Sequence, residues 1–203
     1  MIRKLSLLVA IALIFVGLQA GKANADFALI TNGNFATGDL TGWTLSDSSN
    51  TFAMPQAIAP QNIVPGGPTG NEVLLGTYGT VESISQTFTA TAGQVLSVTF
   101  WLANDDYSGT STFNVLWNGK TETLTQLTNN TPTANGLFSN NFAYNEFQFT
   151  DVAAATTTLA FAFQNDNSEY HLTDVNAAPI PAAVWFFGPG LAGLFGLKKK
   201  FLG

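Results

Sequence analysis

Apolar and polar residues alternate with a period of two through much of this sequence, and no stretch of residues 26–178 keeps the period of a helix. Residues 95–102 are the clearest example, because every second side chain is a large apolar one: Leu96, Val98, Phe100 and Leu102. The pattern recurs at residues 84–88, 113–117, 147–149, 159–163 and 170–172. Many short alternating segments separated by turn residues predict an all-β fold, an antiparallel β-sandwich.

Turn and loop residues divide these segments. Asn118 and Gly119 separate the alternating residues 113–117 from a run with threonine at every second position, residues 121–125. Because Asn-Gly tolerates positive φ at both central positions of a type I′ turn, we expect a β-hairpin here. Residues 46–69 carry four prolines and predict a long surface loop.

The two ends of the chain hold six of its seven basic residues, and all thirteen acidic residues lie between them. At the N-terminus, two basic residues precede an apolar run of about 14 residues, shorter than the roughly 20 that span a bilayer. Ala23 and Ala25 then supply the small side chains that a signal peptidase reads. We therefore expect residues 1–25 to be a signal peptide, cleaved before Asp26.

The C-terminal segment, residues 179–203, combines a proline motif, an apolar run and a basic end. Pro179 and Pro181 stand before Ala182, which starts an apolar run of sixteen residues. As a helix this run would rise about 24 Å, less than a hydrocarbon core of about 30 Å. Three basic residues follow it and should stay on the cytoplasmic side: Lys198, Lys199 and Lys200. The pattern predicts a short hydrophobic helix that enters the inner membrane transiently.

In this order, the three features resemble the PEP-CTERM sorting tails of bacteria, and residues 179–188 resemble their VPLPA variant. The resemblance covers about 25 residues. It implies that an exosortase-type sorting enzyme recognises the tail and directs the protein to the cell envelope or extracellular matrix. Two departures stand out, since no Glu lies between the prolines and lysines replace the commoner arginines.

The segment between the two ends, residues 26–178, is long enough for one domain that buries about two thirds of its unfolded surface. It has one lysine against thirteen acidic residues, so it would repel the phosphates of a nucleic acid. The sequence has no cysteine, so this domain must be stable in an oxidising compartment without disulfides.

Residues 32–43, which begin Asn-Gly-Asn-Phe and end Gly-Trp, resemble the opening motif of galactose-binding-like jelly rolls. Residues 84–102 and 170–175 are similar to later strands of that family, so the resemblance spans nearly the whole domain and implies a jelly-roll β-sandwich. In its carbohydrate-binding members, a Glu after the first Phe and an Asp in the last strand often hold a structural calcium. Here Ala36 takes the first position and Asp174 the second. The resemblance therefore implies no cofactor beyond a structural calcium at Asp174.

Catalytic residue types are scarce. The single histidine, His171, lies on an expected strand, where Asp174 would face the opposite side, so we expect a surface or edge histidine without chemistry. One histidine and no cysteine exclude thiol catalysis and the usual zinc sites. Two carboxylate pairs could hydrolyse a glycosidic bond, although their polar surroundings predict solvated loops: Asp105 with Asp106, and Asp166 with Glu169.

Aromatic residues remain as candidates for ligand contact. Trp101 lies opposite the apolar face of its strand, and Tyr107 lies in a polar loop just after it. Asn104 and Asp105, between these two, could bind sugar hydroxyls. Two other tryptophans are expected in the core: Trp43 and Trp117.

Together these features predict an exported protein of the cell envelope or extracellular matrix, with a non-catalytic, carbohydrate-binding-like domain. Its expected partners are a signal peptidase, an exosortase-type enzyme and an extracellular polysaccharide. Two alternatives stay open, a structural matrix or surface protein without a small ligand and a glycoside hydrolase. Saturable sugar binding, self-association without it, or hydrolysis that depends on a carboxylate would distinguish the three.

Overall fold

The computed structural model describes residues 29–46, 51–58, 67–105, 110–128 and 143–180, and residues 28–179 form one compact unit. Several of the predicted functional residues lie outside the described residues: Ala23, Ala25, Asp106, Tyr107, Pro181, Ala182, Lys198, Lys199 and Lys200. In the described part of the chain, no helix is long and apolar enough to cross a membrane.

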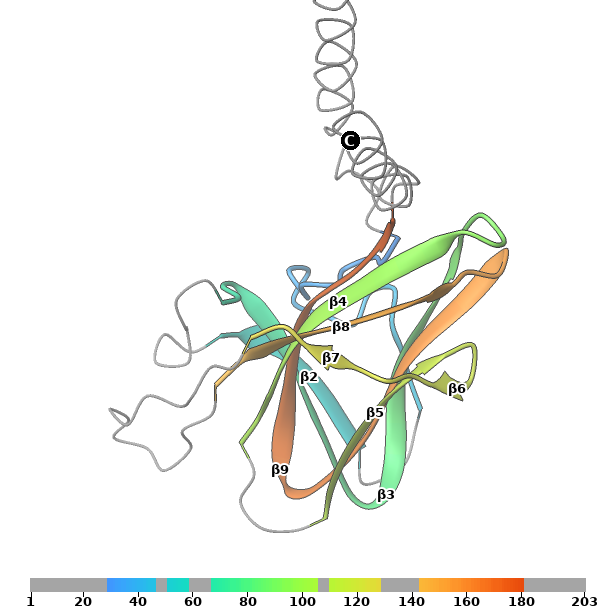
Figure 1. The fold of residues 1–203 in the computed structure, drawn as a ribbon. Coiled ribbons are helices and arrows are strands. Elements are labelled where there is room, and N and C mark those ends of the chain that lie inside the picture. Colours follow the sequence, from blue (N-terminus) through green and yellow to red (C-terminus); the bar gives the residue numbers. More distant parts are fainter. Residues whose placement is uncertain (1–28, 47–50, 59–66, 106–109, 129–142, 181–203) are drawn as a thin grey trace, which may run out of the picture. The chain divides into compact units, whose positions relative to one another are not determined.

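The described residues form nine antiparallel strands (Figure 1). They are β1 (Thr44–Leu45), β2 (Thr51–Ala57), β3 (Asn71–Thr89), β4 (Val95–Asn104), β5 (Ser111–Trp117), β6 (Lys120–Thr121), β7 (Thr125–Gln126), β8 (Asn145–Val152) and β9 (Thr156–Pro179). The main path through the sheet is β1-β3-β9-β4-β8-β7. Off this path, β2 pairs with β3, β5 pairs with β9, and β6 pairs with β5.

The two longest strands, β3 and β9, pass through both layers of a curled sheet. In one layer, residues 71–77 of β3 pair with β2 and β9, and residues 170–179 of β9 pair with β4, beside β8 and β7. We call this the β4 layer. In the other, residues 82–89 of β3 pair with β1 and with residues 156–163 of β9, residues 159–165 of β9 pair with β5, and β5 pairs with β6; we call it the β5 layer. The register of β3 against β9 shifts between Leu75 and Glu82, where one layer gives way to the other.

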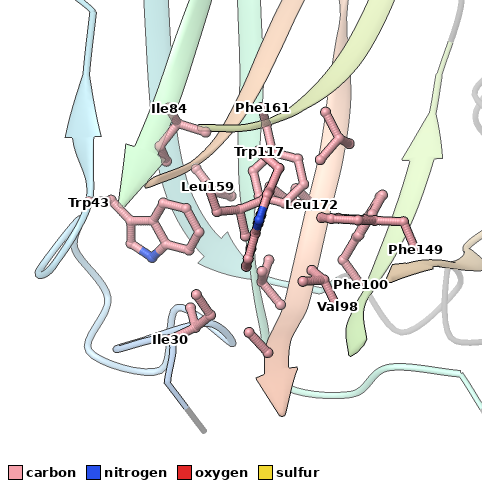
Figure 2. Close-up of a cluster of buried hydrophobic side chains, with 14 of the residues drawn as sticks. Ile30, Trp43, Ile84, Val98, Phe100, Trp117, Phe149, Leu159, Phe161 and Leu172 are labelled. Carbon is pink, nitrogen blue, oxygen red and sulfur yellow. The ribbon is translucent and has the colours of Figure 1, made fainter. Parts of the chain in front are cut away.

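The hydrophobic core lies between these two layers. The ring of Phe100 in the β4 layer meets Phe161 of the β5 layer edge-on, with centroids 5.2 Å apart. Trp117 of the β5 layer likewise packs on Phe149 of the β4 layer at 5.7 Å. Figure 2 shows these four side chains among the others that fill the core. Aromatic side chains bury a large apolar area, and contacts of this kind hold the layers together. The expected all-β antiparallel sandwich is confirmed.

Most of the sequence-based strand predictions agree with the structure. In residues 84–88 the alternating residues Ile84 and Gln86 are buried, as the pattern predicts. The hairpin is confirmed, because Asn118 and Gly119 have φ angles of 51° and 82° between the paired strands β5 and β6. Trp43 and Trp117 are core residues, exposed by only 7% and 2%.

Two expectations about strands were wrong. The proline-rich residues 46–69 contain a strand, β2, in which Pro55 lies opposite Val73 of β3. Among the described strands β2 pairs only with β3, and an edge strand tolerates a proline because one row of its backbone groups needs no partner. Residues 159–163 and 170–172 belong to one continuous strand, β9, rather than to separate strands.

The opening motif of residues 32–43 forms turns that attach to β9. The carbonyl oxygen of Gly33 accepts a hydrogen bond from the amide of Val175 at 2.9 Å. A Cβ atom at Gly33 would lie 1.9 Å from the carbonyl oxygen of Val175, so this close approach requires glycine. Phe35 is fully buried, and its ring stacks on Trp43 at 5.7 Å. The motif therefore closes one end of the core.

Candidate functional site

The outward face of the β4 layer carries the predicted aromatic residue. Trp101 lies opposite Glu146 on β8 and Thr173 on β9, and residues directly opposite each other share a face of the sheet. Neighbouring Phe100 points into the core, so Trp101 points away from it. Its indole is half-buried, because it packs against a small apolar cluster of Ile58, Ala103, Ala143 and Tyr144.

Polar residues occupy other positions near Trp101 on this outward face. Thr99, one outward position earlier on β4, lies opposite Gln148 of β8 and Asn176 of β9. Residues with hydroxyl, amide and carboxylate groups on three adjacent strands thus occupy positions beside Trp101 on the outward face. This combination of a flat apolar face and hydrogen-bonding groups can bind a polar ligand that has an apolar face of its own.

Farther along the same face, His171 lies between two carboxylates. Its Nδ1 atom is 2.9 Å from Oε2 of Glu72 on β3, and its Nε2 atom is 3.7 Å from Oδ2 of Asp105, which follows β4. Glu72 is 1% exposed and His171 5%. We call Glu72, Asp105 and His171 the acid–histidine cluster. A buried group of charges of this kind is stable only if its members are paired and hydrogen-bonded.

Hydrogen bonds from other elements complete the cluster. The hydroxyl of Tyr144 donates to Oε2 of Glu72, and Nε2 of Gln56 donates to Oε1 at 2.9 Å. The Ser168 hydroxyl and the Glu169 amide both donate to Oδ1 of Asp105, the amide at 2.9 Å. Both oxygen atoms of Glu72 and Oδ1 of Asp105 are therefore hydrogen-bonded within the protein, and Oδ2 of Asp105 pairs with Nε2 of His171.

The cluster also fixes the protonation of its members. Burial would lower the pKa of His171, but the flanking carboxylates of Asp105 and Glu72 raise it to about 9. Burial would raise the pKa of Asp105, but His171, Ser168 and the Glu169 amide hold it well below its usual value. Burial, and then the charge of Asp105, raise the pKa of the neighbouring Glu169. At neutral pH His171 is a buried cation beside ionised Asp105.

The expectation of a surface or edge histidine was wrong. His171 is buried, and its hydrogen-bond partner Glu72 lies 99 positions away in the sequence, so a search for local partners could not find it. The expectation of solvated loops was also wrong for Asp105 and Glu169, which are partly buried and bonded to each other. Asp166, on β9, accepts hydrogen bonds from the amide of Gly79 and from Gln164, which lower the pKa of its carboxyl.

The remaining predicted ligand residues do not gather around Trp101. Asn104 donates to the Ser111 hydroxyl at 3.1 Å and accepts from Asn165 at 2.8 Å, so its side chain joins the two layers on the inner side. Asp105 belongs to the acid–histidine cluster. Glu72 was missed by the sequence analysis, although an acidic residue that begins the apolar run of residues 73–75 is a signal for a buried charge.

A metal site finds no support in the side chains. Nowhere in the described segments do three His, Asp or Glu residues come together in a way that could hold a metal ion. Asp174 is half-buried with a φ of 49°, next to the register shift between β4 and β9, and burial raises the pKa of its carboxyl. One carboxylate with a raised pKa is a poor start for calcium, which prefers six or more oxygen ligands.

No protein-family model and no curated protein matches this chain. Among solved structures, the enzymatically active domain of tailspike protein 4 from bacteriophage CBA120 is similar with a TM-score of 0.49 and 13% identity, over 75% of this chain and 21% of that one. The carbohydrate-binding module TmCBM61, solved with β-1,4-galactotriose, has a TM-score of 0.47 and 15% identity over 76% of this chain and 100% of that one. The CBM22-1 xylan-binding domain of Paenibacillus barcinonensis Xyn10C has a TM-score of 0.43 and 12% identity over 74% of this chain and 93% of that one. These TM-scores all lie below 0.5.

Proposed function

We propose that residues 26–178 are a non-catalytic glycan-binding module whose binding face is the outward side of the β4 layer around Trp101. The position of Trp101 supports this most directly, because a large, half-buried indole lies on the outward face of an inner strand, away from the core between the layers. A sugar ring has C–H faces that stack on an indole and hydroxyls that bind polar side chains. Thr99, Glu146 and Gln148 supply such polar groups on the same face.

The absence of catalysis is part of this proposal. Hydrolysis of a glycosidic bond needs two carboxyl groups that can reach the substrate. Glu72 is almost completely buried and is bonded to Tyr144, Gln56 and His171. Asp105 is likewise held by Ser168 and Glu169. Both carboxylates therefore bind side chains and backbone groups of the protein itself and are not placed to reach a substrate.

Calorimetric titration of the exported protein with its host's extracellular polysaccharide tests the binding face. We expect saturable binding with a Kd of about 10 μM to 1 mM, which corresponds to roughly −7 to −4 kcal/mol. Trp101→Ala should weaken it at least about tenfold, while circular dichroism shows an intact fold. Tyr78→Ala is the matched control, since this tyrosine is 61% exposed at the junction of the two layers of β3. Equal binding by Trp101→Ala and the parent would refute the proposed face, and self-association without glycan binding would favour a structural matrix protein.

We further propose that the two ends of the chain direct its export and sorting. The small residues Ala23 and Ala25 support signal-peptide cleavage, and the order of prolines, apolar run and three lysines in residues 179–203 supports processing by an exosortase-type enzyme. The mature protein would begin at Asp26 and end close to Pro181, in the cell envelope or extracellular matrix. Its intact mass tests this, and a mature form that still contains Lys198 to Lys200 would contradict it.

A further inference from the structure

A cavity of about 330 Å³ lies beside β8, where the chain passes from β6 to β7. Its walls come from Lys120, from residues 121–123, from Thr125 and from residues 148–150 of β8. Protein cavities that hold small molecules begin at about 300 Å³, so this one has room for a single small ring rather than for an oligomer.

Threonine hydroxyls on the cavity wall are available to a ligand. Four exposed threonines line it: Thr121, Thr123, Thr125 and Thr150. Their hydroxyl groups have no hydrogen-bond partner within the described ranges of the chain. Other threonine hydroxyls form hydrogen bonds within the protein, as between Thr87 and Thr158, whose hydroxyl oxygens lie 2.8 Å apart. Exposed hydroxyls exchange readily between water and the hydroxyls of a ligand.

Gln148 and Phe149 complete the wall. The amide nitrogen of Gln148 donates to the Ser97 hydroxyl at 2.6 Å, which fixes the amide and leaves its oxygen as an acceptor at the cavity. Phe149 also lines the cavity, while its ring packs on Trp117 in the core. Polar groups that both donate and accept suit a ligand rich in hydroxyl groups.

Charge at the cavity selects against anions. The Nζ atom of Lys120 lies 3.1 Å from Oε1 of Glu122 and 3.5 Å from Oδ2 of Asp151. These two carboxylates outnumber the single cation, so an acidic sugar would gain no free positive charge and would be repelled by the excess negative charge. An uncharged ligand meets no such penalty.

We propose that this cavity is a second saccharide subsite, which binds one uncharged sugar residue through the hydroxyls of Thr121, Thr123, Thr125 and Thr150. This proposal rests on the proposed glycan-binding function. It adds the location of a second binding site and the expectation that the sugar bound there is uncharged. Gln148 connects the two sites, because it lines the cavity and also lies opposite Thr99, one outward position from Trp101. A glycan chain bound at Trp101 can therefore continue across β8 into the cavity.

Amide chemical shifts of the full chain test the subsite directly. Glucose, galactose and mannose are the neutral probes, and galacturonate is the anionic counterpart of galactose. We expect saturable shifts of the amides of residues 121–125 and 148–150 with at least one neutral sugar, and weaker binding of galacturonate. The double variant Thr123→Val, Thr125→Val should weaken the neutral sugar at the cavity at least about threefold, because two hydrogen-bonding groups are lost without a change of shape. Thr89→Val, an exposed threonine at the end of β3, is the matched control.

The Trp101 indole resonance separates this proposal from the previous one. If the indole shifts and no cavity amide moves with any neutral sugar, the subsite is refuted and the binding face survives. If the cavity amides shift and the indole does not, the subsite stands and the face around Trp101 is refuted. Sugars that move neither set of resonances overturn both, and tighter binding of galacturonate than of galactose overturns the charge selection.

Discussion

The Nδ1 atom of His171 lies 2.9 Å from Oε2 of Glu72, although 99 positions separate the two residues in the sequence. They meet because β9 and β3 are neighbours, with His171 opposite Leu74 of β3. The acid–histidine cluster thus ties the last described strand to the first long one, on the face that also carries Trp101. Its charges are buried, so its energetics differ from those of a surface ion pair.

Removing the histidine should destabilise the protein strongly. His171→Ala leaves the carboxylates of Glu72 and Asp105 buried without their cation, and breaking a buried pair in this way costs about 3–5 kcal/mol. Urea unfolding measures the loss. The double variant Glu72→Gln, His171→Gln should cost less than the sum of its single changes, because the two side chains act as a unit. A cost for His171→Ala within about 0.5 kcal/mol would mean that the cluster contributes nothing.

Stability should fall as the solution becomes alkaline. The pKa of His171 is raised from 6.5 to about 9, so the folded protein holds this proton more tightly than the unfolded chain does. Protonated His171 therefore stabilises the folded state fully below about pH 6.5, and this stabilisation is lost as the pH rises through 9. At 1.36 kcal/mol for each unit by which the pKa is raised, its contribution to the free energy of unfolding is at most about 3 kcal/mol. When His171 loses its proton, the carboxyl groups that lose its positive charge as a neighbour are those of Glu72, Asp105 and Glu169.

Melting temperatures between pH 6 and pH 10 measure this loss. His171→Gln, which cannot titrate, is the control, since it keeps every other group that titrates at alkaline pH. The difference in melting temperature between parent and variant should shrink across this range. Parallel curves for the two proteins would contradict the role of His171.

A methyl group at Gly33 should be far more costly than one at Gly38. Gly33→Ala would bring Cβ to 1.9 Å from the Val175 carbonyl oxygen, which belongs to the backbone of β9 and cannot move aside easily. We expect a loss at or above the upper end of the 1–3 kcal/mol typical of overpacking. At Gly38, whose φ is 73°, no atom lies within 4 Å, so Gly38→Ala should cost only the backbone strain of about 1–2 kcal/mol. Equal costs in thermal unfolding would show that the motif is not held against β9.

Truncating Trp43 should open a cavity at the end of the core. Its ring packs on Phe35 and Phe161, and its Nε1 atom donates to the carbonyl oxygen of Asn32 at 3.1 Å. Trp43→Ala should therefore cost about 3–5 kcal/mol in urea unfolding. The exposed Tyr78 provides the control, since Tyr78→Ala should change stability by less than about 0.5 kcal/mol. A small loss at Trp43 would place this residue outside the cooperative core.

Local patterns predicted much of the sandwich. Apolar and polar residues alternate in residues 95–102 because one face of β4 meets the core. Asn118 and Gly119 specify the hairpin of β5 and β6 because both residues adopt positive φ angles. The pattern was misleading where a global constraint outweighed the local signal. Pro55 argues against a strand in general, yet among the strands that the structure describes β2 pairs only with β3, and an edge strand tolerates a proline.

The site was less predictable than the fold. The outward direction of Trp101 follows from its neighbours on β4, so alternation alone indicates it. Glu72 and His171 come together only through the register of β3 against β9, which no local pattern encodes. Because a buried charge is stable only with a partner, Glu72 at the start of an apolar run signals that a partner exists without indicating which residue it is.

The length of β9 bears on the order in which the chain can fold. This strand comes last among those described, and it lies beside β3, β4 and β5, so neither layer is whole before residues 156–179 have been synthesised. Pairings between distant parts of a sequence form slowly, since long loops must close first. A nascent or truncated chain that ends before Thr156 therefore presents the unpaired edges of these three strands, which are templates for aggregation. Only a chain that includes residues 156–179 can cover the edges of β3, β4 and β5 and complete both layers.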